Sequence, residues 1–517
     1  MSFEIVFVMV ALIGMVCALI WDKMRPGMIL LTVCVAFLCV GILTPKEMLE
    51  GFSNKGMITV AMLFLVSEGI RQSGALGQLI KKLLPEGKTT VFKAQVRMLP
   101  PVAFISAFLN NTPVVVIFAP IIKRWADSVK LPATKFLIPL SYVTILGGIC
   151  TLIGTSTNLV VHGMILEAGY EGFTIFELSK VGVFIALAGI LYLFLFSNKL
   201  LPDNREEQVV DEEEENSPGH LHKVEAVLGA RFPGINKKLS DFNFQRHYGA
   251  EVKEIKTRNG QRYVDHLEDV VLREGDTLVV MADDTFIPTW GESSVFVLLT
   301  NGNDPDTSGK KKRWLALILL VLMIVGATVG ELPATKEMFP DIKLDMFFFV
   351  CITTIIMAWT NIFPARKYTK YISWDILITI ACAFAISKAM VNSGVADCVA
   401  GFIIGLSDDY GPHVLLAILF VITNLFTELI TNNAAAALAF PWALSISAQL
   451  GVSPTPFFVV ICMAASASFS TPIGYQTNLI VQGIGNYKFT DFVRIGLPLN
   501  IITFLISVIL IPLIWNF

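Results

Sequence analysis

This sequence is poor in charge. Only 16% of its 517 residues are Asp, Glu, Lys or Arg, whereas soluble proteins carry about 25%. Hydrophobic residues make up 54% of the chain, and its 37 Phe and 17 Met sit in long apolar stretches. So little charge excludes an ordinary soluble protein and predicts a chain that crosses a membrane many times.

Other absences narrow the function. The net charge of −3 offers no basic surface, so the sequence predicts no nucleic-acid partner. The eight cysteines form no CxxC or CxxH pair and are interpreted as packed free thiols rather than metal ligands or disulfides. No nucleophile–base pair, phosphate-binding GxxxxGK[ST] or metal-ligand set occurs. We therefore expect neither an enzyme nor an organic cofactor.

Long apolar runs supply the spanning helices, each of which needs about 20 residues. The first run has no basic leader and no small-residue cleavage site, so it is interpreted as a retained helix rather than a signal peptide. The predicted spans are 3–20, 27–43, 56–72, 136–163, 177–201, 314–331, 345–362, 374–391, 455–484 and 491–515.

Two further apolar stretches, 99–122 and 412–447, contain Pro and a central cluster of amides and hydroxyls. Backbone interrupted in this way is tolerated at membrane depth only inside protein or along a watery cavity. They are predicted to be broken helices or re-entrant hairpins.

The middle of the chain is soluble in composition. Short β-like stretches at 223–228, 251–257 and 277–282 alternate with turn signals such as Asn259-Gly260. We expect a small α/β domain between two membrane halves. The predicted divisions are a first transmembrane repeat at 1–202, an acidic linker at 203–222, the inserted domain at 223–300, a basic linker at 301–313 and a second repeat at 314–517.

The two membrane halves are related in sequence. The string that begins at Thr151 (TLIGTSTNLVVHG) recurs 320 positions later at Thr471 (TPIGYQTNLIVQG), with eight of thirteen residues identical. Nearly the same offset pairs Asn110-Asn111-Thr112 with Thr431-Asn432-Asn433. Agreement at separate places predicts an internal repeat.

Basic residues set the expected topology. With the N-terminus outside, the basic residues of 71–97, 123–135, 310–313 and 366–370 face the cytoplasm, as does the insert over 203–313. Five spans per half, an odd number, require the second half to be inverted. Inverted repeats with interrupted helices are typical of secondary transporters. The predicted fold is therefore a multi-pass protein of the cell membrane, built from two inverted repeats of five helices and one re-entrant hairpin each, with both termini outside.

Polar residues at bilayer depth are the candidates for chemistry. They form four clusters, at 110–113, 154–158, 431–433 and 474–478. Amide and hydroxyl oxygens, with carbonyls freed where Gly unwinds a helix, suit a dehydrated monovalent cation, whereas helix N-termini suit an anion. A single Asn would be explained by helix–helix hydrogen bonding, but recurrence in register favours a binding site. Glu428 could carry a proton or serve as a structural acid.

At these residues the chain resembles the divalent anion–sodium symporter family of the ion transporter superfamily. That family has a Ser-Asn-Thr motif at each hairpin tip, and the nearest matches here are Asn110-Asn111-Thr112 and Thr431-Asn432-Asn433, the latter after Thr427-Glu428. The resemblance implies two sodium sites, an anion between them and a homodimer. Helices 1 and 2 with 314–331 and 345–362 would form the scaffold and dimer surface.

Carried over position by position, the resemblance implies a division of roles. One sodium site would combine Asn111 with Gly154, Thr155, Thr157 and Asn158. The other would combine Asn432 and Asn433 with Gly474, Thr477 and Asn478. The anion would contact Asn110, Thr112, Ser156, Thr431, Tyr475 and Gln476.

The departures from the family pattern bear on the substrate. Neither hairpin keeps Ser at its first position, and the second ends in Asn rather than Thr. The strings at 151–158 and 471–478 look more like the sulfate-type branch, whose members often carry such an insert. Sulfate or a similar oxyanion is therefore expected, with a di- or tricarboxylate such as succinate or citrate as the alternative.

The insert is similar to the C-terminal domain of TrkA-type regulators (the RCK C-terminal domain), through 224–228, Phe232-Pro233-Gly234, 256–260 and 273–278. This likeness implies a small regulatory ligand. It also leaves open an alternative of another class, a cation channel gated by the insert, although no TVGYG-like filter is present.

Overall fold

The structure is a computed structural model. It describes residues 3–21, 24–85, 87–203, 222–229, 232–257, 261–283, 286, 290, 295–300, 310–339, 342–406 and 411–517. Most of the predicted acidic linker and most of the predicted basic linker lie outside these residues. Seven helices within the described ranges are long and apolar enough to cross a membrane, and shorter apolar helices accompany them.

The first membrane half comprises the following helices: α1 (Phe3–Trp21), α2 (Pro26–Val40), α3 (Pro45–Glu50), α4 (Lys55–Gln72), α5 (Ala75–Leu83), α6 (Val91–Ser106), α7 (Asn111–Ser128), α8 (Leu137–Gly148), α9 (Ser156–Glu167) and α10 (Ser179–Leu200). The second half comprises α13 (Lys310–Gly330), α14 (Pro333–Met338), α15 (Met346–Trp359), α16 (Tyr368–Tyr371), α17 (Trp374–Asn392), α18 (Val395–Leu406), α19 (Gly411–Leu429), α20 (Asn432–Leu450), α21 (Thr455–Ser466), α22 (Gln476–Gly485) and α23 (Phe489–Ile514).

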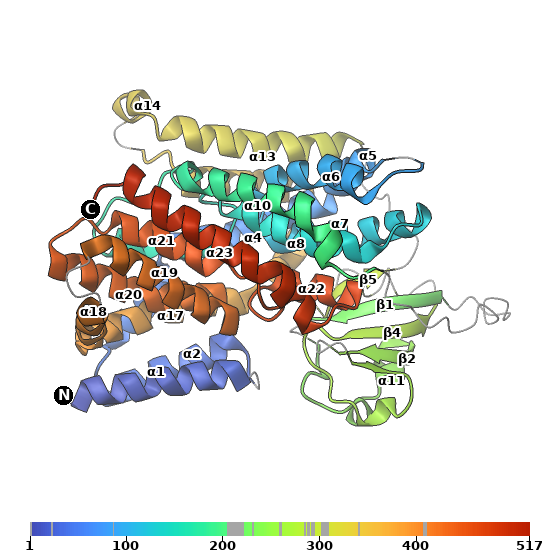
Figure 1. The fold of residues 1–517 in the computed structure, drawn as a ribbon, viewed down its shortest axis with the longest axis horizontal. Coiled ribbons are helices and arrows are strands. Elements are labelled where there is room, and N and C mark those ends of the chain that lie inside the picture. The colour runs from blue at the N-terminus through green and yellow to red at the C-terminus, as the bar shows by residue number, and fades with distance from the viewer. Residues whose placement is uncertain are drawn as a thin grey trace.

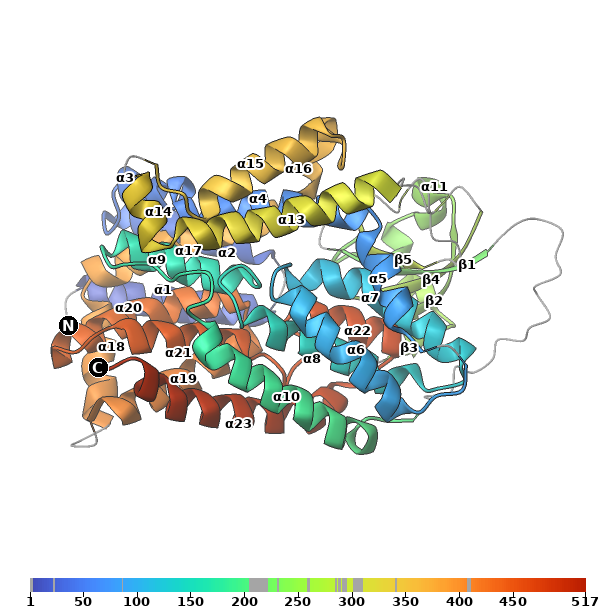
Figure 2. The same cartoon turned by 90° about the horizontal axis from the view of Figure 1, so that it is seen from above.

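The two halves have the same order of elements, which confirms the internal repeat. Helices α4 to α10 of the first half correspond to α17 to α23 of the second, and α9 and α22 begin 320 positions apart. The second half is inverted. Figures 1 and 2 show α7 and α8 toward the end that carries the insert, whereas their counterparts α20 and α21 lie toward the opposite end, beside both termini.

Two stretches that were predicted as continuous spans are broken. The stretch 136–163 is α8 and α9, separated by a non-helical loop at 149–155, and 455–484 is α21 and α22, separated by 467–475. The predicted interrupted stretches are hairpins, α6 with α7 and α19 with α20. Each break lies at polar residues, and the two loops also contain a glycine, Gly154 or Gly474; both features weaken a helix because side chains and freed backbone make contacts of another kind.

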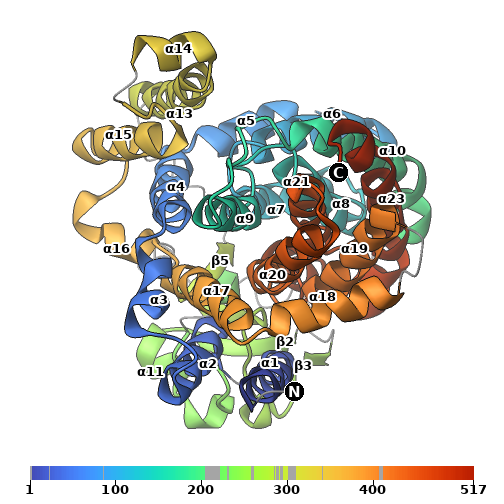
Figure 3. The same cartoon turned by 90° about the vertical axis from the view of Figure 1, so that its left-hand side faces the viewer.

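Burial separates an inner group of helices from an outer one. Every residue of α8 is buried, as is every residue of α21 except Thr455. In contrast, α1 and α13 expose large apolar side chains such as Val10, Trp21 and Trp314. Figure 3, viewed from the end with both termini, shows α7, α9, α20 and α21 grouped together, with α1, α2, α13 and α15 outside them. The broken helices and the hairpin arms that follow the two tips therefore form the core.

Over its described residues, the insert is a small sheet accompanied by the short helix α11. Its strands are β1 (His222–Leu228), β2 (Glu251–Lys256), β3 (Arg262–Tyr263), β4 (Thr277–Ala282) and β5 (Phe296–Thr300), with α11 (Phe244–Tyr248) packed beside them. The order is β3-β2-β4-β1-β5 and all pairs are antiparallel. The three predicted strands are confirmed to within one residue, whereas β3 and β5 were not predicted.

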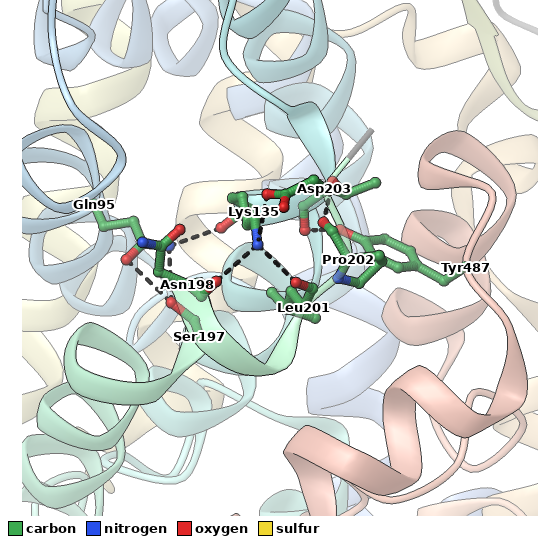
Figure 4. Close-up of polar contacts among 9 residues, drawn as sticks. Gln95, Lys135, Ser197, Asn198, Leu201, Pro202, Asp203 and Tyr487 are labelled. Carbon is green, nitrogen blue, oxygen red and sulfur yellow. Dashed lines mark hydrogen bonds and ion pairs between the residues drawn. The ribbon is translucent and has the colours of Figure 1, made fainter. Parts of the chain in front are cut away.

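The connection to the insert leaves the membrane half at a polar junction (Figure 4). The buried Lys135 ammonium donates to the carbonyls of Asn198 and Leu201 at 2.7 and 2.6 Å, and pairs with Asp203 at 3.0 Å. A cation at these carbonyls complements the C-terminal end of α10. From the second half, the Tyr487 hydroxyl donates to the carbonyl of Thr134. Both halves are thereby held together where the chain turns toward the insert.

Candidate functional site

Four helices begin in the middle of the molecule. Two follow hairpin tips, α7 at Asn111 and α20 at Asn432, and two follow the non-helical loops, α9 at Ser156 and α22 at Gln476. Side-chain contacts join them across the repeats: Thr112 of α7 lies 3.4 Å from Gln476, and Asn433 of α20 lies 3.3 Å from Ser156. Because the N-terminal end of a helix is electropositive, this central junction favours negative charge without any Lys or Arg.

In the first repeat, hydrogen bonds fix the hairpin tip to the loop. Ser106 Oγ donates to Asn111 Oδ1 at 2.7 Å, five residues along the hairpin. Thr151 Oγ1 donates to the hairpin carbonyl of Ala107 and accepts from the amide of Gly154 at 3.2 Å. Asn158 Nδ2 donates to the carbonyl of Thr151 at 2.9 Å. The polar residues therefore close the loop on the tip.

The second repeat reproduces this scheme with different residues. Thr427 Oγ1 lies 2.7 Å from Asn432 Oδ1, again five residues apart. Thr471 Oγ1 donates to the hairpin carbonyl of Glu428 at 2.9 Å and accepts from Gly474 N at 3.2 Å. Asn478 Nδ2 donates to the carbonyl of Thr471 at 3.1 Å. The two repeats therefore contain polar regions with one hydrogen-bonding scheme.

Close packing explains a glycine in each loop. A Cβ on Gly154 would lie 2.5 Å from the carbonyl oxygen of Gly148, and one on Gly474 would lie 2.5 Å from that of Thr427. Real Cβ atoms do not approach a carbonyl so closely. Glycine is therefore required for each loop to pack against its neighbouring backbone.

Some of the predicted site residues form hydrogen bonds with the opposite repeat. The Tyr475 hydroxyl accepts from Asn111 Nδ2 at 2.6 Å and lies 3.2 Å from Thr155 Oγ1, both in the first repeat. Asn433 Oδ1 accepts from Ser156 Oγ and Thr157 Oγ1, each at 3.3 Å. The two regions are thus linked by hydrogen bonds and form one unit.

Burial divides the predicted residues by role. The predicted sodium ligands are all buried, with Asn158, Thr477 and Asn478 fully so: Asn111, Gly154, Thr155, Thr157, Asn158, Asn432, Asn433, Gly474, Thr477 and Asn478. The predicted anion residues are partly or fully exposed, except Tyr475: Asn110, Thr112, Ser156, Thr431 and Gln476. A dehydrated cation and a more accessible anion would require such a division.

Two buried oxygens in this region have no hydrogen-bond partner among the described residues. Among the described residues nothing donates to Asn158 Oδ1 or to Thr431 Oγ1, although both atoms are buried. A buried acceptor without a donor costs about 1–3 kcal/mol. Carbonyl and hydroxyl oxygens in this state suit sodium, a hard cation that prefers oxygen ligands.

Glu428 breaks the symmetry between the repeats. It occupies the place of Ala107, and its Oε1 accepts from the amide of Ser470 at 2.8 Å and from Asn500 Nδ2 at 2.7 Å. Among the described residues its buried Oε2 and the Asn500 Oδ1 have no partner. The carboxyl group thus orients the second loop, and Oε2 is free to hold a proton or a cation.

Sequence reasoning did not select several residues that hold the junction together. They are Ser106, Ser141, Thr151, Thr427, Thr471 and Asn500. Thr151 and Thr471 open the two repeated strings, so their identity at equivalent positions was a usable signal. Ser141 lies in an apolar helix and donates to Thr477 and Asn478, a contact that only the packing of α8 against α22 reveals.

Comparison with known proteins decides the family. The citrate transporter (CitMHS) family model matches residues 16–447 and, in an overlapping second match, 338–517. The chain belongs to the citrate transporter family.

Several known proteins are similar to this citrate transporter family member over most of both chains. An uncharacterized transporter of Synechocystis is 29% identical over 94% of this chain and 93% of its own. The uncharacterized transporter YfbS of Escherichia coli is 26% identical over the full length of both. Sodium/sulfate cotransporter 2 of Chlamydomonas reinhardtii is 23% identical over 91% of this chain and 85% of its own.

Family membership fixes the general class. This member of the citrate transporter family is a multi-pass membrane transporter and not an enzyme, as its sequence predicted. The alternative of a gated cation channel has no support among these relatives.

Proposed function

We propose that the protein is a sodium-coupled symporter of a divalent anion, with sulfate as the favoured substrate. The observation that carries this proposal is the junction where four helix N-terminal ends meet uncharged, buried oxygens from both repeats. Its chemistry is binding rather than catalysis. Sodium orders the hairpin tips, the anion completes the site, and the inner helices move against a scaffold of α1, α2, α13 and α15.

The anion is held without fixed positive charge. Backbone amides at the starts of α7, α9, α20 and α22 supply donors, and the hydroxyls of Thr112, Ser156 and Thr431 and the amides of Asn110 and Gln476 add neutral ones. Bound sodium adds the remaining positive charge, so affinity for the anion depends on sodium. A small tetrahedral oxyanion presents acceptors in every direction, which fits donors that come from several helices.

Sodium in turn is held without fixed negative charge. Asn111 with residues 154–158, at the start of α9, provides one set of oxygens, and Asn432 with residues 474–478, at the start of α22, provides the other. The spare oxygen of Asn158 supports the first set. Since Asn433 contacts the first loop, each cation affects the ordering of the opposite tip.

The alternative substrate is a di- or tricarboxylate. The family is described as citrate transporters, whereas full-length relatives include a sodium/sulfate cotransporter. The absence of Arg and Lys among the predicted anion residues favours the smaller oxyanion, because carboxylate pairs are most strongly bound by Arg in bidentate contacts.

Transport into proteoliposomes tests the function. Labelled sulfate, succinate and citrate are offered in parallel, each with an inward sodium gradient and with the same gradient replaced by potassium. We expect sulfate to accumulate only with sodium and the carboxylates to compete weakly. Accumulation of a carboxylate but not sulfate selects the alternative, and equal uptake with potassium contradicts sodium coupling.

Glu428 decides whether a proton joins the coupling. We expect Glu428→Gln to keep sodium-dependent uptake but to remove its dependence on external pH, because the amide reproduces the acceptor atom and cannot bind a proton at Oε2. Glu428→Asp serves as the control that retains the acid. An unchanged pH profile in Glu428→Gln assigns the residue a structural role.

Location and assembly complete the proposal. Lys123 pairs with Glu225 of the insert and Lys135 pairs with Asp203 at the connection to it, whereas Asp397 belongs to α18, which Figure 1 shows at the end with both termini. This distribution supports a cytoplasmic insert and external termini. The homodimer, formed through the outer helices, and the likeness of the insert to TrkA-type domains with a small regulatory ligand stand as parts of the same proposal.

A further inference from the structure

The sheet of the insert is buried on both faces. One face forms the core of the insert with Val224, Ala226 and Leu228 of β1 and Leu278 and Val280 of β4. Successive residues of a strand point to opposite faces. The second face therefore carries the intervening residues. Four of them are buried, namely Val227, Lys256, Thr277 and Val279, and the side chain of Glu225 is only 15% exposed.

The second face is covered by helices of the membrane body. Val227, which is 1% exposed, belongs to the apolar core of the transmembrane helices and not to the core of the insert. Thr277 is also 1% exposed and lies against α22, and β5 lies beside α7. Figure 1 shows α22 directly beside the sheet. A five-stranded sheet with an apolar second face needs such a cover to be stable in water.

Charge complements the apolar contact. Glu225 Oε2 pairs with Lys123 of α7 at 3.0 Å, and Glu225 Oε1 pairs with Lys256 of β2 at 3.2 Å. Burial by itself would raise the pKa of the Glu225 carboxyl, but the two ammonium groups outweigh it and lower the pKa to about 2. The carboxylate is therefore charged throughout the physiological range and links the insert to α7.

The contact with α22 depends on a glycine. A Cβ on Gly483 would lie 2.5 Å from Thr277 Oγ1, and one on Gly275 would lie 3.7 Å from Leu479 Cβ. The strand and the helix thus approach closely. Gly483 and Leu479 lie on the helix that begins at Gln476, and Lys123 lies on the helix that begins at Asn111. The insert contacts the far ends of two helices whose first residues are in the binding junction.

We propose that the second face of the sheet is a docking surface for α7 and α22, and that the insert and these two helices move as one body during transport. Any event that reshapes the turn at 273–276 then acts directly on the helices that hold the predicted sodium and anion residues.

Disulfide cross-linking tests this proposal. Thr277→Cys is combined with Gly483→Cys, and in a second pair Gly275→Cys is combined with Leu479→Cys, where 3.7 Å between the Cβ atoms suits a disulfide. No native cysteine lies in 222–300 or 476–485. A protease site placed in 301–309 separates the two cysteines of each pair, so a cross-link keeps the fragments together on a non-reducing gel. Val264→Cys with Leu479→Cys is the control, because Val264 is 49% exposed and Gly483 is left unchanged.

We expect at least one designed pair to cross-link on mild oxidation, the control pair to stay separate, and the cross-linked protein to take up labelled sulfate at a rate within about twofold of the reduced protein, as for parts that keep one mutual arrangement. Absence of cross-linking in both pairs overturns the docking. A cross-link that abolishes uptake until dithiothreitol is added overturns the common motion.

Neutralising Glu225 provides a second readout. Glu225→Gln removes the charge that faces Lys123. We expect it to cross-link more slowly than the control Glu251→Gln, which removes a carboxylate from a side chain that is 57% exposed. Equal rates contradict a role for the ion pair in docking. The uptake rate rests on the proposed function, but cross-linking yield does not. A protein that cross-links and transports no anion in any state therefore contradicts the function and leaves the docking supported.

Discussion

The two polar regions share a hydrogen-bonding scheme but not the residues that face the centre. Thr151 and Thr471 close their loops in the same way, and Asn158 and Asn478 donate to equivalent carbonyls. The differences lie at Thr155 against Tyr475 and at Ala107 against Glu428. The comparison teaches that the loop architecture is common to both repeats, whereas the groups that face the centre differ. The two proposed cation sites are therefore expected to bind sodium with different affinity.

The most damaging change should strike the shared architecture. We expect Gly474→Ala and Gly154→Ala each to reduce uptake about a hundredfold and to lower stability by about 1–3 kcal/mol, because a Cβ would overlap the hairpin or loop backbone. The measurements are uptake and thermal unfolding. Gly14→Ala and Gly405→Ala are controls with no atom within 4 Å of the new Cβ. Tolerance at one loop only would mean that the two loops pack differently.

A change to the tip amides should separate the two cation sites. We expect Asn111→Ala to raise the sodium concentration for half-maximal thermal stabilisation about tenfold or more, and Asn432→Ala to do so less strongly, because only Asn111 also donates to Tyr475. Wild-type sodium titrations should be cooperative, and each variant should lose that cooperativity. Unchanged stabilisation in both variants would place the cation elsewhere.

We expect the smallest effect from removing the Tyr475 hydroxyl, which links the two polar regions. Tyr475→Phe keeps the ring but removes the hydroxyl that contacts Asn111 and Thr155, so we expect a three- to tenfold loss of sodium affinity, about the net worth of one hydrogen bond. Tyr170→Phe, at a side chain 44% exposed, is the matched control. A loss of anion affinity with unchanged sodium affinity would instead support the predicted role of Tyr475 in anion binding.

The sequence predicted much of this arrangement because its signals were local. Long apolar runs located the helices, repeated strings revealed the two halves, and polar residues within apolar stretches marked the bends at 107–110 and 149–155. The breaks were harder to bound, since 136–163 and 455–484 are apolar almost throughout. Hydropathy cannot distinguish a straight helix from two half-helices joined by a packed loop.

What could not be predicted depends on contacts between distant segments. The hydrogen bond from Asn111 to Tyr475 joins residues 364 positions apart, and the one from Ser141 to Asn478 joins residues 337 apart. No spacing rule within one repeat indicates that Asn433 reaches the loop of the other. Similarly, the alternation in β1 suggests one buried face only, and burial of Val227 follows from its packing into the apolar core of the membrane helices.

The cover on the second face of the sheet also constrains the order of synthesis. Strands β1 to β5 leave the ribosome well before α22, which lies near the end of the chain. Helix α7 precedes the insert and is already available, but until α22 is made and inserted, Thr277 and Gly275 lack their neighbours Gly483 and Leu479, so part of the second face stays uncovered. A truncated chain that stops before 476 would keep this part of the face exposed, and self-association of such fragments is the expected consequence.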